Sequence, residues 1–401
     1  MIVAVTGTSG KTSVADFARQ IFAALGRKAA SLGTIGVIKS DSAVYGSLTT
    51  PDPVSLHQTL AGLADEGITH LAMEASSHGL DQFRLDGVRL TAAAFTNLGR
   101  DHLDYHATIE DYLRAKLRLF TEVLGPGGTA VVFIDDGHDL APGGPVRDVL
   151  ESCRRAGRKV LTVGIGCGEI ACRPGVERSF PQVVMVSVRG QHFETRLPLI
   201  GAYQRDNALT AAGLAIAAGC GPEAVFSAFA GLQGVPGRLE LVDSAASAPV
   251  LVDYAHKPDA LERVLAELRQ DVGAGGRLIC VFGCGGDRDR GKRPIMGDIA
   301  ARLADVAIVT DDNPRSEAPA AIRAEILAGV EAVHQPKVRE IGDREAAIGA
   351  AVAMARAGDV VVVAGKGHET GQIIGDTVIA FSDHEAIRRA VQRIKDKDAK
   401  A

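Results

Sequence analysis

Short apolar segments alternate with amphipathic ones along most of this chain. Buried strands are predicted by the apolar segments IVAV, THLAMEA, AAAFTNL and TAVVFI. Helices are predicted where apolar residues recur at helical spacing and a glycine follows, in SVADFARQIFAALG and DPVSLHQTLAGLADEG. Strands that alternate with helices in this way favour a mostly parallel sheet with helices on both faces.

The pattern changes towards the middle of the chain and then resumes. An antiparallel hairpin is predicted by PQVVMVSVRGQHFETRLPL, and a helix by the alanine-rich GAYQRDNALTAAGLAIAAG. Glycine and proline then gather without periodicity in GLQGVPGRLELVD, so we expect two domains, 1–238 and 239–401. Beyond this segment, strands are predicted at VLVDYA, RLICVFG, VAIVTDD and DVVVVAG, and helices at ALERVLAELRQ, RPIMGDIAARLA and AIRAEILAGV.

Composition excludes several classes of function. The formal charge is -5 and only 4% of the 401 residues are aromatic, with no Trp, which argues against a nucleic-acid-binding surface. No run of about 18 apolar residues occurs, and the initial MIVAV is too short for a signal peptide, so we expect a cytoplasmic protein without membrane insertion. The six cysteines show no paired CxxC spacing, which favours ordinary reduced thiols over zinc ligands or disulfides.

A glycine-rich segment near the start, TGTSGKT, predicts a nucleotide site because it lies between a strand and a helix. Glycines let successive backbone N–H groups converge on phosphate oxygens, and the helix adds its positive N-terminal dipole. Lys11 would reach the β- and γ-phosphates, and the Thr12 hydroxyl would bind Mg²⁺. The strict pattern has glycine where this chain has Val5, so the loop is a variant. The predicted ATP-binding residues are Gly7, Thr8, Ser9, Gly10, Lys11, Thr12 and Ser13.

Four further residues, two of them a histidine pair, allow two interpretations when taken alone. Glu74 follows a predicted strand, where a carboxylate is equally typical of a helix cap and of a metal ligand. His102 and His106 have the spacing of a metal pair, but no companion glutamate motif supports zinc. Lys116 lies in an amphipathic segment, where a solvated lysine is the default expectation.

In the second half, three apolar strands end in Gly-Cys-Gly-Gly, Asp-Asp-Asn-Pro and Gly-Lys-Gly-His. Small and polar residues are thereby brought to the carboxyl ends of parallel strands, where open α/β sheets bind ligands.

The chain resembles the Mur ligase family through an ordered series of motifs. These are TGTSGKT, TTPDP, EASSHGLDQFR, FTNLGRDHLDYH, YLRAKLRLF, YAHKPDAL, GCGGDRDRGKRP, DDNPRSE and AGKGHE. The likeness extends from Ile2 to about Ile394 and is greatest to the members that add meso-diaminopimelate to UDP-MurNAc-L-Ala-D-Glu in peptidoglycan synthesis. It implies an α/β fold: a P-loop ATPase domain with a mostly parallel sheet, then a Rossmann-like domain.

The resemblance implies an ATP-dependent amide ligase that is a monomer and binds small molecules. ATP phosphorylates the carboxylate of one substrate, and the amine of the other attacks the acyl phosphate, leaving ADP and phosphate. Lys11 would serve catalysis, while Thr12, Glu74 and His102 would bind Mg²⁺. Lys116 matches the lysine that the family modifies with CO₂, and its carbamate (N6-carboxylysine) would be an anionic magnesium ligand.

Substrate contacts are implied in the same way. Asn207 and His256 match positions near the adenine and ribose of ATP, although Gln204 and Lys257 beside them depart from the residues common in the family. The muramoyl-dipeptide residues would be Thr49, Thr50, Ser77, Gln82 and Arg84. The diaminopimelate residues would be Arg288, Asp312, Asn313, Pro314, Arg315, Gly365 and Glu369.

Arg315 is the residue on which the choice of amino acid depends. Diaminopimelate has a distal carboxylate that a guanidinium can bind through two hydrogen bonds, whereas lysine lacks this carboxylate. Glu369 suits the distal ammonium. The competing interpretation of DNPR is an Asx-Pro turn that carries a surface arginine.

Family members also have an N-terminal domain that binds UDP, and this sequence begins directly with the strand of the ATPase domain. We therefore expect that domain to be absent here and a UDP-linked substrate to be held less tightly. Two alternatives remain: a ligase for L-lysine or another carboxylate acceptor, as in folylpolyglutamate synthases, or a non-catalytic nucleotide-binding fragment. The segments DNPR and SSHGLDQFR argue against the first, and the presence of Lys11, Glu74, His102 and Lys116 argues against the second.

Overall fold

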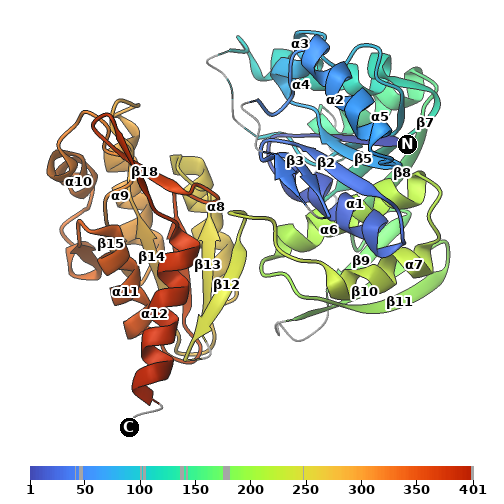
Figure 1. The fold of residues 1–401 in the computed structure, drawn as a ribbon. Coiled ribbons are helices and arrows are strands. Elements are labelled where there is room, and N and C mark those ends of the chain that lie inside the picture. Colours follow the sequence, from blue (N-terminus) through green and yellow to red (C-terminus); the bar gives the residue numbers. More distant parts are fainter. Residues whose placement is uncertain are drawn as a thin grey trace. The chain divides into compact units, whose positions relative to one another are not determined.

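The chain forms two compact units, Met1–Gln233 and Gly234–Ala401. The computed structural model describes residues 1–40, 42–44, 48–99, 102, 105–135, 140, 143–174, 181–246 and 248–398. Each unit is built on its own β-sheet with helices on both faces (Figure 1). The division falls within GLQGVPGRLELVD, at Gln233, whereas the sequence placed it at residue 238.

Eleven strands of the described chain form the sheet of the first unit, in the order β11-β10-β9-β8-β7-β6-β1-β5-β2-β3-β4. The pairings from β9 to β2 are parallel, and those at both edges are antiparallel. The strands are β1 (Ile2–Thr6), β2 (Ala29–Gly33), β3 (Gly36–Lys39), β4 (Ala43–Val44), β5 (His70–Glu74), β6 (Leu90–Phe95), β7 (Leu124–Ile134), β8 (Lys159–Ile165), β9 (Ile170–Pro174), β10 (Gln182–Val188) and β11 (Gln191–Leu197).

Helices cover both faces of this sheet. They are α1 (Lys11–Ala24), α2 (Pro53–Asp65), α3 (Ser77–Asp81), α4 (Ile109–Arg118), α5 (Pro145–Arg155), α6 (Ala202–Ala217) and α7 (Pro222–Ser227), with a π-helical turn at Leu119–Val123 and a 3₁₀ turn at Ala228–Gly231. Apolar residues of α2 to α5 form one continuous core with the central strands. On the other face α1 packs against α6, and both contact strands of the sheet.

Local signals explain where several of these helices begin. Asp52 accepts hydrogen bonds from the backbone N–H groups of Val54 and Ser55, and Pro53 occupies the first turn of α2. Thr108 likewise caps α4, because its hydroxyl accepts a hydrogen bond from the backbone N–H of Asp111. The predicted strands and helices of both halves are confirmed, as is the antiparallel hairpin, which is β10 paired with β11.

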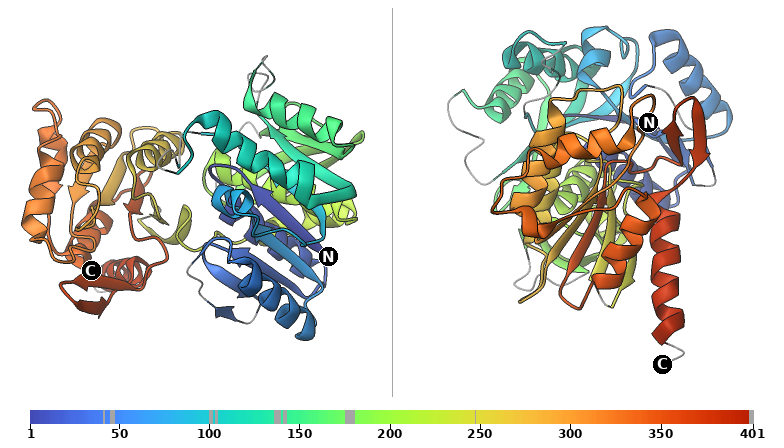
Figure 2. Two further views of the ribbon diagram at one scale, coloured as in Figure 1. Left: turned by 90° about the horizontal axis from the view of Figure 1, so that it is seen from above. Right: turned by 90° about the vertical axis from the view of Figure 1, so that its left-hand side faces the viewer.

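The second unit has a six-stranded sheet in the order β12-β13-β17-β14-β15-β16, antiparallel only between β12 and β13 (Figures 1 and 2). Its strands are β12 (Glu240–Ala245), β13 (Ala248–Asp253), β14 (Leu278–Phe282), β15 (Val306–Val309), β16 (Val338–Glu340) and β17 (Val360–Ala364), and a separate hairpin is formed by β18 (Gly371–Ile374) and β19 (Thr377–Ala380). Its helices are α8 (Pro258–Arg269), α9 (Lys292–Leu303), α10 (Pro319–Leu327), α11 (Arg344–Met354) and α12 (Asp383–Asp398), with a 3₁₀ turn at Gln335–Lys337.

One core cluster of this unit lies between its sheet and the helices α11 and α12, while α8, α9 and α10 pack against the other face with buried apolar residues of their own. Cys280 and Cys284 are buried at the end of β14, as predicted, and burial raises the pKa of both thiols to about 12. All six cysteines are free thiols. In the described part of the chain, no helix is both long and apolar enough to cross a membrane.

Candidate active site

The loop between β1 and α1 is shaped by two glycines with positive φ, 151° at Gly7 and 86° at Gly10. A Cβ atom at Gly7 would overlap the Thr96 hydroxyl, and one at Gly10 would overlap the Asn207 carboxamide. Lys11 begins α1, so the N–H groups of the first helical turn face the loop. This is the geometry that a phosphate-binding loop requires.

Asn97 holds the loop in place, and the sequence analysis missed it. The backbone N–H of Ser9 donates to Asn97 Oδ1 (3.0 Å), and that of Thr8 donates to the Asn97 carbonyl (3.0 Å). The Thr96 hydroxyl donates to the Ser9 carbonyl (2.7 Å). The available signal was that Thr96 and Asn97 are polar residues directly after the buried strand β6.

Two lysine side chains meet at the carbonyl of Gly7. Lys11 Nζ donates to the carbonyls of Gly7 (2.9 Å) and Thr8 (3.0 Å), and Lys116 Nζ donates to that of Gly7 (2.8 Å). Lys116 is 1% exposed and its Nζ lies 4.2 Å from the ring centroid of Tyr112. The expectation of a solvated lysine is therefore wrong, because Lys116 lies on the buried face of α4.

Glu74 is the last residue of β5 and pairs with Val5 of β1, so it lies at the carboxyl ends of the parallel strands, where the loop after β1 also begins. Its side chain is 1% exposed; Oε1 accepts from the Thr34 backbone N–H (2.7 Å) and Oε2 from the Thr34 hydroxyl (3.2 Å). Ser76, not Glu74, caps α3, so the helix-cap interpretation is wrong. Thr34, 40 residues away in the sequence, is a second residue that sequence reasoning missed.

Three histidines and two tyrosines gather beside α4. The ring of His102 lies 4.9 Å from that of His78 and 6.1 Å from that of Tyr112, and His106 lies 5.2 Å from Tyr112. Burial lowers the pKa of His106, and its Nε2 has no hydrogen-bond partner among the described residues. Within the described ranges, no three His, Cys, Asp or Glu side chains could together hold a metal.

The predicted dipeptide residues lie around the short helix α3, which begins at Ser77 and is followed by Gln82 and Arg84. Arg84 donates to the Thr50 carbonyl (2.8 Å) and to Gln82 Oε1 (3.0 Å from Nε), and Thr50 donates to the Glu74 carbonyl (3.1 Å). Thr49 exchanges a hydrogen bond with Thr34 (3.0 Å between hydroxyl oxygens). The buried Ser77 hydroxyl has no partner in the described chain, and such a group is typical of a ligand contact.

Two loops of the second unit bring together the residues predicted for the amino acid. Asp312, Asn313, Pro314 and Arg315 follow β15, and Gly365 and Glu369 follow β17. Arg315 has φ 52° and is half-buried; its Nη1 donates to the carbonyl of Gly286 (2.8 Å). Arg315 is therefore not a fully exposed arginine, and its role in binding remains a prediction. Arg288, in contrast, is exposed and donates to the Asp287 carbonyl (3.1 Å).

Lys366 lies at the centre of these loops and was also missed. Its side chain is fully buried, with Nζ 3.0 Å from Asn313 Oδ1, 3.0 Å from Glu369 Oε2 and 3.7 Å from Asp312 Oδ1. The segment AGKGHE was part of the motif series, but local sequence gave no sign that this lysine is buried.

The two residues predicted near the adenosine lie in different units. Asn207 of α6 is 7% exposed and donates to Gln204 Oε1 (3.3 Å). Its carboxamide packs against the backbone of Gly10. His256 Nδ1 lies 2.8 Å from the Tyr254 carbonyl, and burial lowers its pKa. Nearby, burial raises the pKa of the Asp253 carboxyl to about 6.

Comparison with known proteins gives the same domain order. The Mur ligase middle domain matches residues 5–215, and the Mur ligase glutamate ligase domain matches residues 237–367. The chain belongs to the Mur ligase family. It is therefore a ligase, and its two units correspond to two successive Mur ligase domains.

Several relatives of this Mur ligase share one name. The UDP-N-acetylmuramoyl-L-alanyl-D-glutamate–2,6-diaminopimelate ligase of Brucella melitensis is 56% identical over 98% of this chain and 78% of its own length. The enzyme of the same name from Caulobacter vibrioides is 49% identical over 100% and 80%. A solved structure of such a ligase, 36% identical, covers 98% of this chain and 78% of its own, with a TM-score of 0.73. Mycobacterium tuberculosis folylpolyglutamate synthase shares the fold at 21% identity (TM-score 0.69, covering 91% and 87%).

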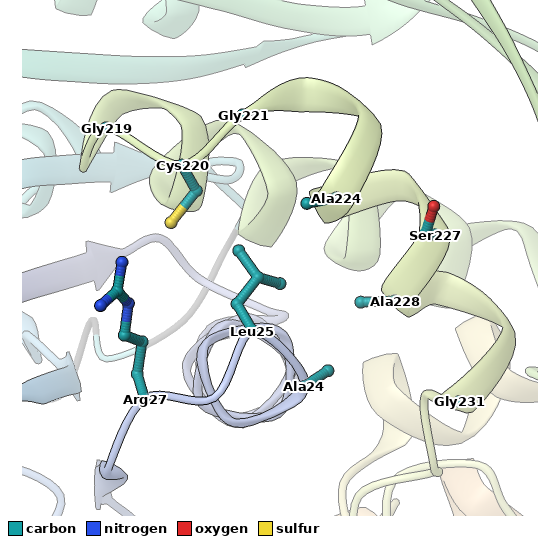
Figure 3. A pocket seen from close by; sticks show the side chains of 10 residues that line it. All are labelled: Ala24, Leu25, Arg27, Gly219, Cys220, Gly221, Ala224, Ser227, Ala228 and Gly231. Atoms are coloured by element: carbon teal, nitrogen blue, oxygen red, sulfur yellow. The ribbon is translucent and has the colours of Figure 1, made fainter.

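One hollow of this Mur ligase lies away from the predicted site. Leu25, Arg27, Cys220 and Ala224 line it, where the C-terminal end of α1 faces the turn between α6 and α7 (Figure 3). The 14-residue helix α1 separates it from the phosphate loop by about 20 Å, given the rise of about 1.5 Å per residue. The hollow is therefore not part of the nucleotide site.

Proposed function

We propose that this Mur ligase joins meso-diaminopimelate to the terminal carboxylate of UDP-MurNAc-L-Ala-D-Glu and converts ATP to ADP and phosphate. The identity of 56% over 98% of the chain to a ligase of that name carries the proposal. The half-buried Arg315, next to the carboxylate-bearing loops after β15 and β17, supports the choice of amino acid.

A carboxylate is a poor electrophile, so the reaction first needs a leaving group. The γ-phosphoryl group of ATP moves to a carboxylate oxygen, which breaks its bond to ADP and forms an acyl phosphate. The neutral amine of diaminopimelate then attacks the carbonyl carbon, and the intermediate expels phosphate and loses a nitrogen proton to leave the amide. Lys11 and the N–H groups of residues 7–13 would bind the phosphates, where preorganised donors stabilise developing charge.

The residues present suit magnesium. Mg²⁺ in phosphate sites commonly takes one or two carboxylates and completes its shell with water and substrate phosphates, so a three-residue cluster is not required. Glu74 is a buried carboxylate at the edge of the sheet where the loop lies. Thr12, Glu74 and His102 would hold the ion, whose chemistry is to neutralise phosphate charge.

Lys116 would join them as a carbamate. Its neutral amine would form an N–C bond to CO₂ and release a proton, which turns a cation into an anionic oxygen ligand. Its burial and its contact with the same carbonyl that Lys11 binds support this proposal, because two ammonium groups there would repel each other and the ion.

Substrate recognition would be divided between the two units. Arg84, with Thr49, Thr50, Ser77 and Gln82, would bind the muramoyl dipeptide, and Asn207 and His256 would lie near the adenosine. Arg315 would bind the distal carboxylate of diaminopimelate, and Glu369 with Asp312 its distal ammonium. Lysine would leave Arg315 without a carboxylate partner, which disfavours it.

The deciding experiment measures phosphate release from ATP with UDP-MurNAc-L-Ala-D-Glu and either meso-diaminopimelate or L-lysine. We expect release with diaminopimelate only, and its loss in Arg315→Met but not in Arg339→Met, where Arg339 is an exposed residue of β16. Release with lysine instead would overturn the choice of amino acid. Normal ATP binding without turnover on any acceptor would favour the non-catalytic alternative.

A further inference from the structure

A fully buried lysine connects the loops that carry the amino-acid residues. Lys366 follows β17 by two residues, and the exposed fraction of its side chain is 0%. Burial of an ammonium is unfavourable unless ionic or hydrogen-bonding partners compensate for the lost water. Here the compensation comes from Asn313 Oδ1 (3.0 Å), Glu369 Oε2 (3.0 Å) and Asp312 Oδ1 (3.7 Å).

Both ends of the Asn313 carboxamide are used inside the protein. Its Oδ1 accepts from Lys366 Nζ and from the backbone N–H of Ile373 (3.0 Å), while its Nδ2 donates to Glu369 Oε2 (3.0 Å). Because one end accepts and the other donates, its orientation is determined by these partners. Asn313 is also 6% exposed, so little of it is left for a ligand.

Glu369 is held through one oxygen only. Its Oε2 accepts from Lys366 and Asn313, and within the described residues its Oε1 has no hydrogen bond. The side chain remains 33% exposed. The Oε1 atom is thus a preformed acceptor, because the two hydrogen bonds to Oε2 hold the carboxylate in position.

We infer that Lys366, together with Asn313, is a positioning residue for the incoming amino acid: it holds Glu369 and Asp312 in place for an ammonium group without contacting that group. The inference rests on the proposed function, which supplies an ammonium-bearing substrate. Asn313, predicted as a direct contact, takes a positioning role instead.

Charge explains why a lysine is needed. The carboxylates of Asp312 and Glu369 both approach the ammonium of Lys366, which offsets their mutual repulsion. Two negative charges and one positive charge leave a net charge of about -1 to attract the ammonium of the ligand. Without Lys366, two neighbouring carboxylates in a partly buried region would move apart or one would take up a proton. Either change removes the acceptor for the ligand's ammonium.

The test compares Lys366→Met with the wild type in two reactions. In steady state, KM for meso-diaminopimelate should rise at least about tenfold, as expected for loss of a charge-assisted contact, while KM for ATP and for UDP-MurNAc-L-Ala-D-Glu stays unchanged. In the absence of amino acid, positional isotope exchange in ¹⁸O-labelled ATP with UDP-MurNAc-L-Ala-D-Glu reports acyl-phosphate formation alone. This exchange should proceed at the wild-type rate.

A second variant covers the case in which Lys366→Met fails to fold. Asn313→Asp keeps an oxygen for Lys366 and for the Ile373 N–H, but replaces the donor to Glu369 with a repelling oxygen. It should raise the same KM selectively. Lys395→Met, which removes a 59% exposed lysine of α12, is the matched control and should behave as wild type.

The outcomes separate the two proposals. An unchanged KM for diaminopimelate in the folded variants would overturn the positioning role, as would an equal loss in both reactions, which indicates a merely structural role. A wild-type enzyme that exchanges isotope but releases no phosphate with diaminopimelate would instead overturn the proposed function.

Discussion

Gly33→Ala is predicted to displace the carboxylate of Glu74 without disturbing the backbone. Gly33 ends β2 and its φ lies outside the left-handed region, so alanine is conformationally acceptable there. An added Cβ would lie 2.5 Å from Cδ and 2.6 Å from Cγ of Glu74. The effect of the substitution is therefore steric.

The size of the displacement follows from these distances. The nearest atom, Glu74 Oε1, is closer to the added Cβ than Cδ is, and ordinary contact begins at 3.4 Å, so the carboxylate must move by at least about 0.9 Å. Glu74 has little room, because it is 1% exposed and its oxygens are bonded to Thr34. Overpacking of this kind lowers the free energy of unfolding by about 1–3 kcal/mol. A misplacement of about 1 Å at a reacting site lowers kcat by about 100-fold.

The assay is phosphate release measured over a magnesium titration, together with urea unfolding. We expect Gly33→Ala to lower kcat and to need more Mg²⁺ for half-maximal rate. Gly62→Ala is the matched control: Gly62 lies inside α2 with open space around it, so this variant should keep full activity and gain about 0.5–1 kcal/mol in the free energy of unfolding.

The reasoning would be refuted by a Gly33→Ala enzyme with wild-type kcat and wild-type magnesium dependence. A loss of stability with unchanged catalysis would keep the steric argument and remove the magnesium role of Glu74.

Three further predictions use other parts of the site. In Gly285→Ala, the added Cβ would lie 2.9 Å from Arg315 Nη1 and would push the guanidinium aside. KM for diaminopimelate should therefore rise about tenfold in the phosphate-release assay, with little change in the thermal midpoint of unfolding. An unchanged KM would contradict the role of Arg315. Lys116→Ala should lose activity that added short-chain carboxylates partly restore, and full activity without them would remove the carbamate. For Asp253, a folded-state pKa raised to about 6 means that ionisation penalises the folded state: the penalty is absent below the ordinary pKa and complete above pH 6. The stability of the wild type relative to Asp253→Asn should therefore fall by about 3 kcal/mol between pH 3 and 7 in urea unfolding, and a pH-independent difference would contradict the buried carboxyl.

Local sequence patterns were sufficient to predict the secondary structure of this protein and the loops that carry its site. Apolar periodicity located the strands and helices of both units, and polar residues after buried strands indicated where the loops of the site would lie. The turn at residues 7–10 could be predicted because glycines at fixed spacing before Lys11 are needed by its backbone conformation. These signals are short-range, and the sequence carries them directly.

Only the tertiary structure decided which side chains are buried and what they contact. Lys116 and Lys366 have ordinary lysine surroundings in the sequence, yet both are buried because their elements pack against others. Thr34 reaches Glu74 across 40 residues, and Lys366 reaches Asn313 across 53. The environment of a polar group, and hence its charge state and its chemistry, depends on neighbours that chain folding brings together, and no local pattern specifies them.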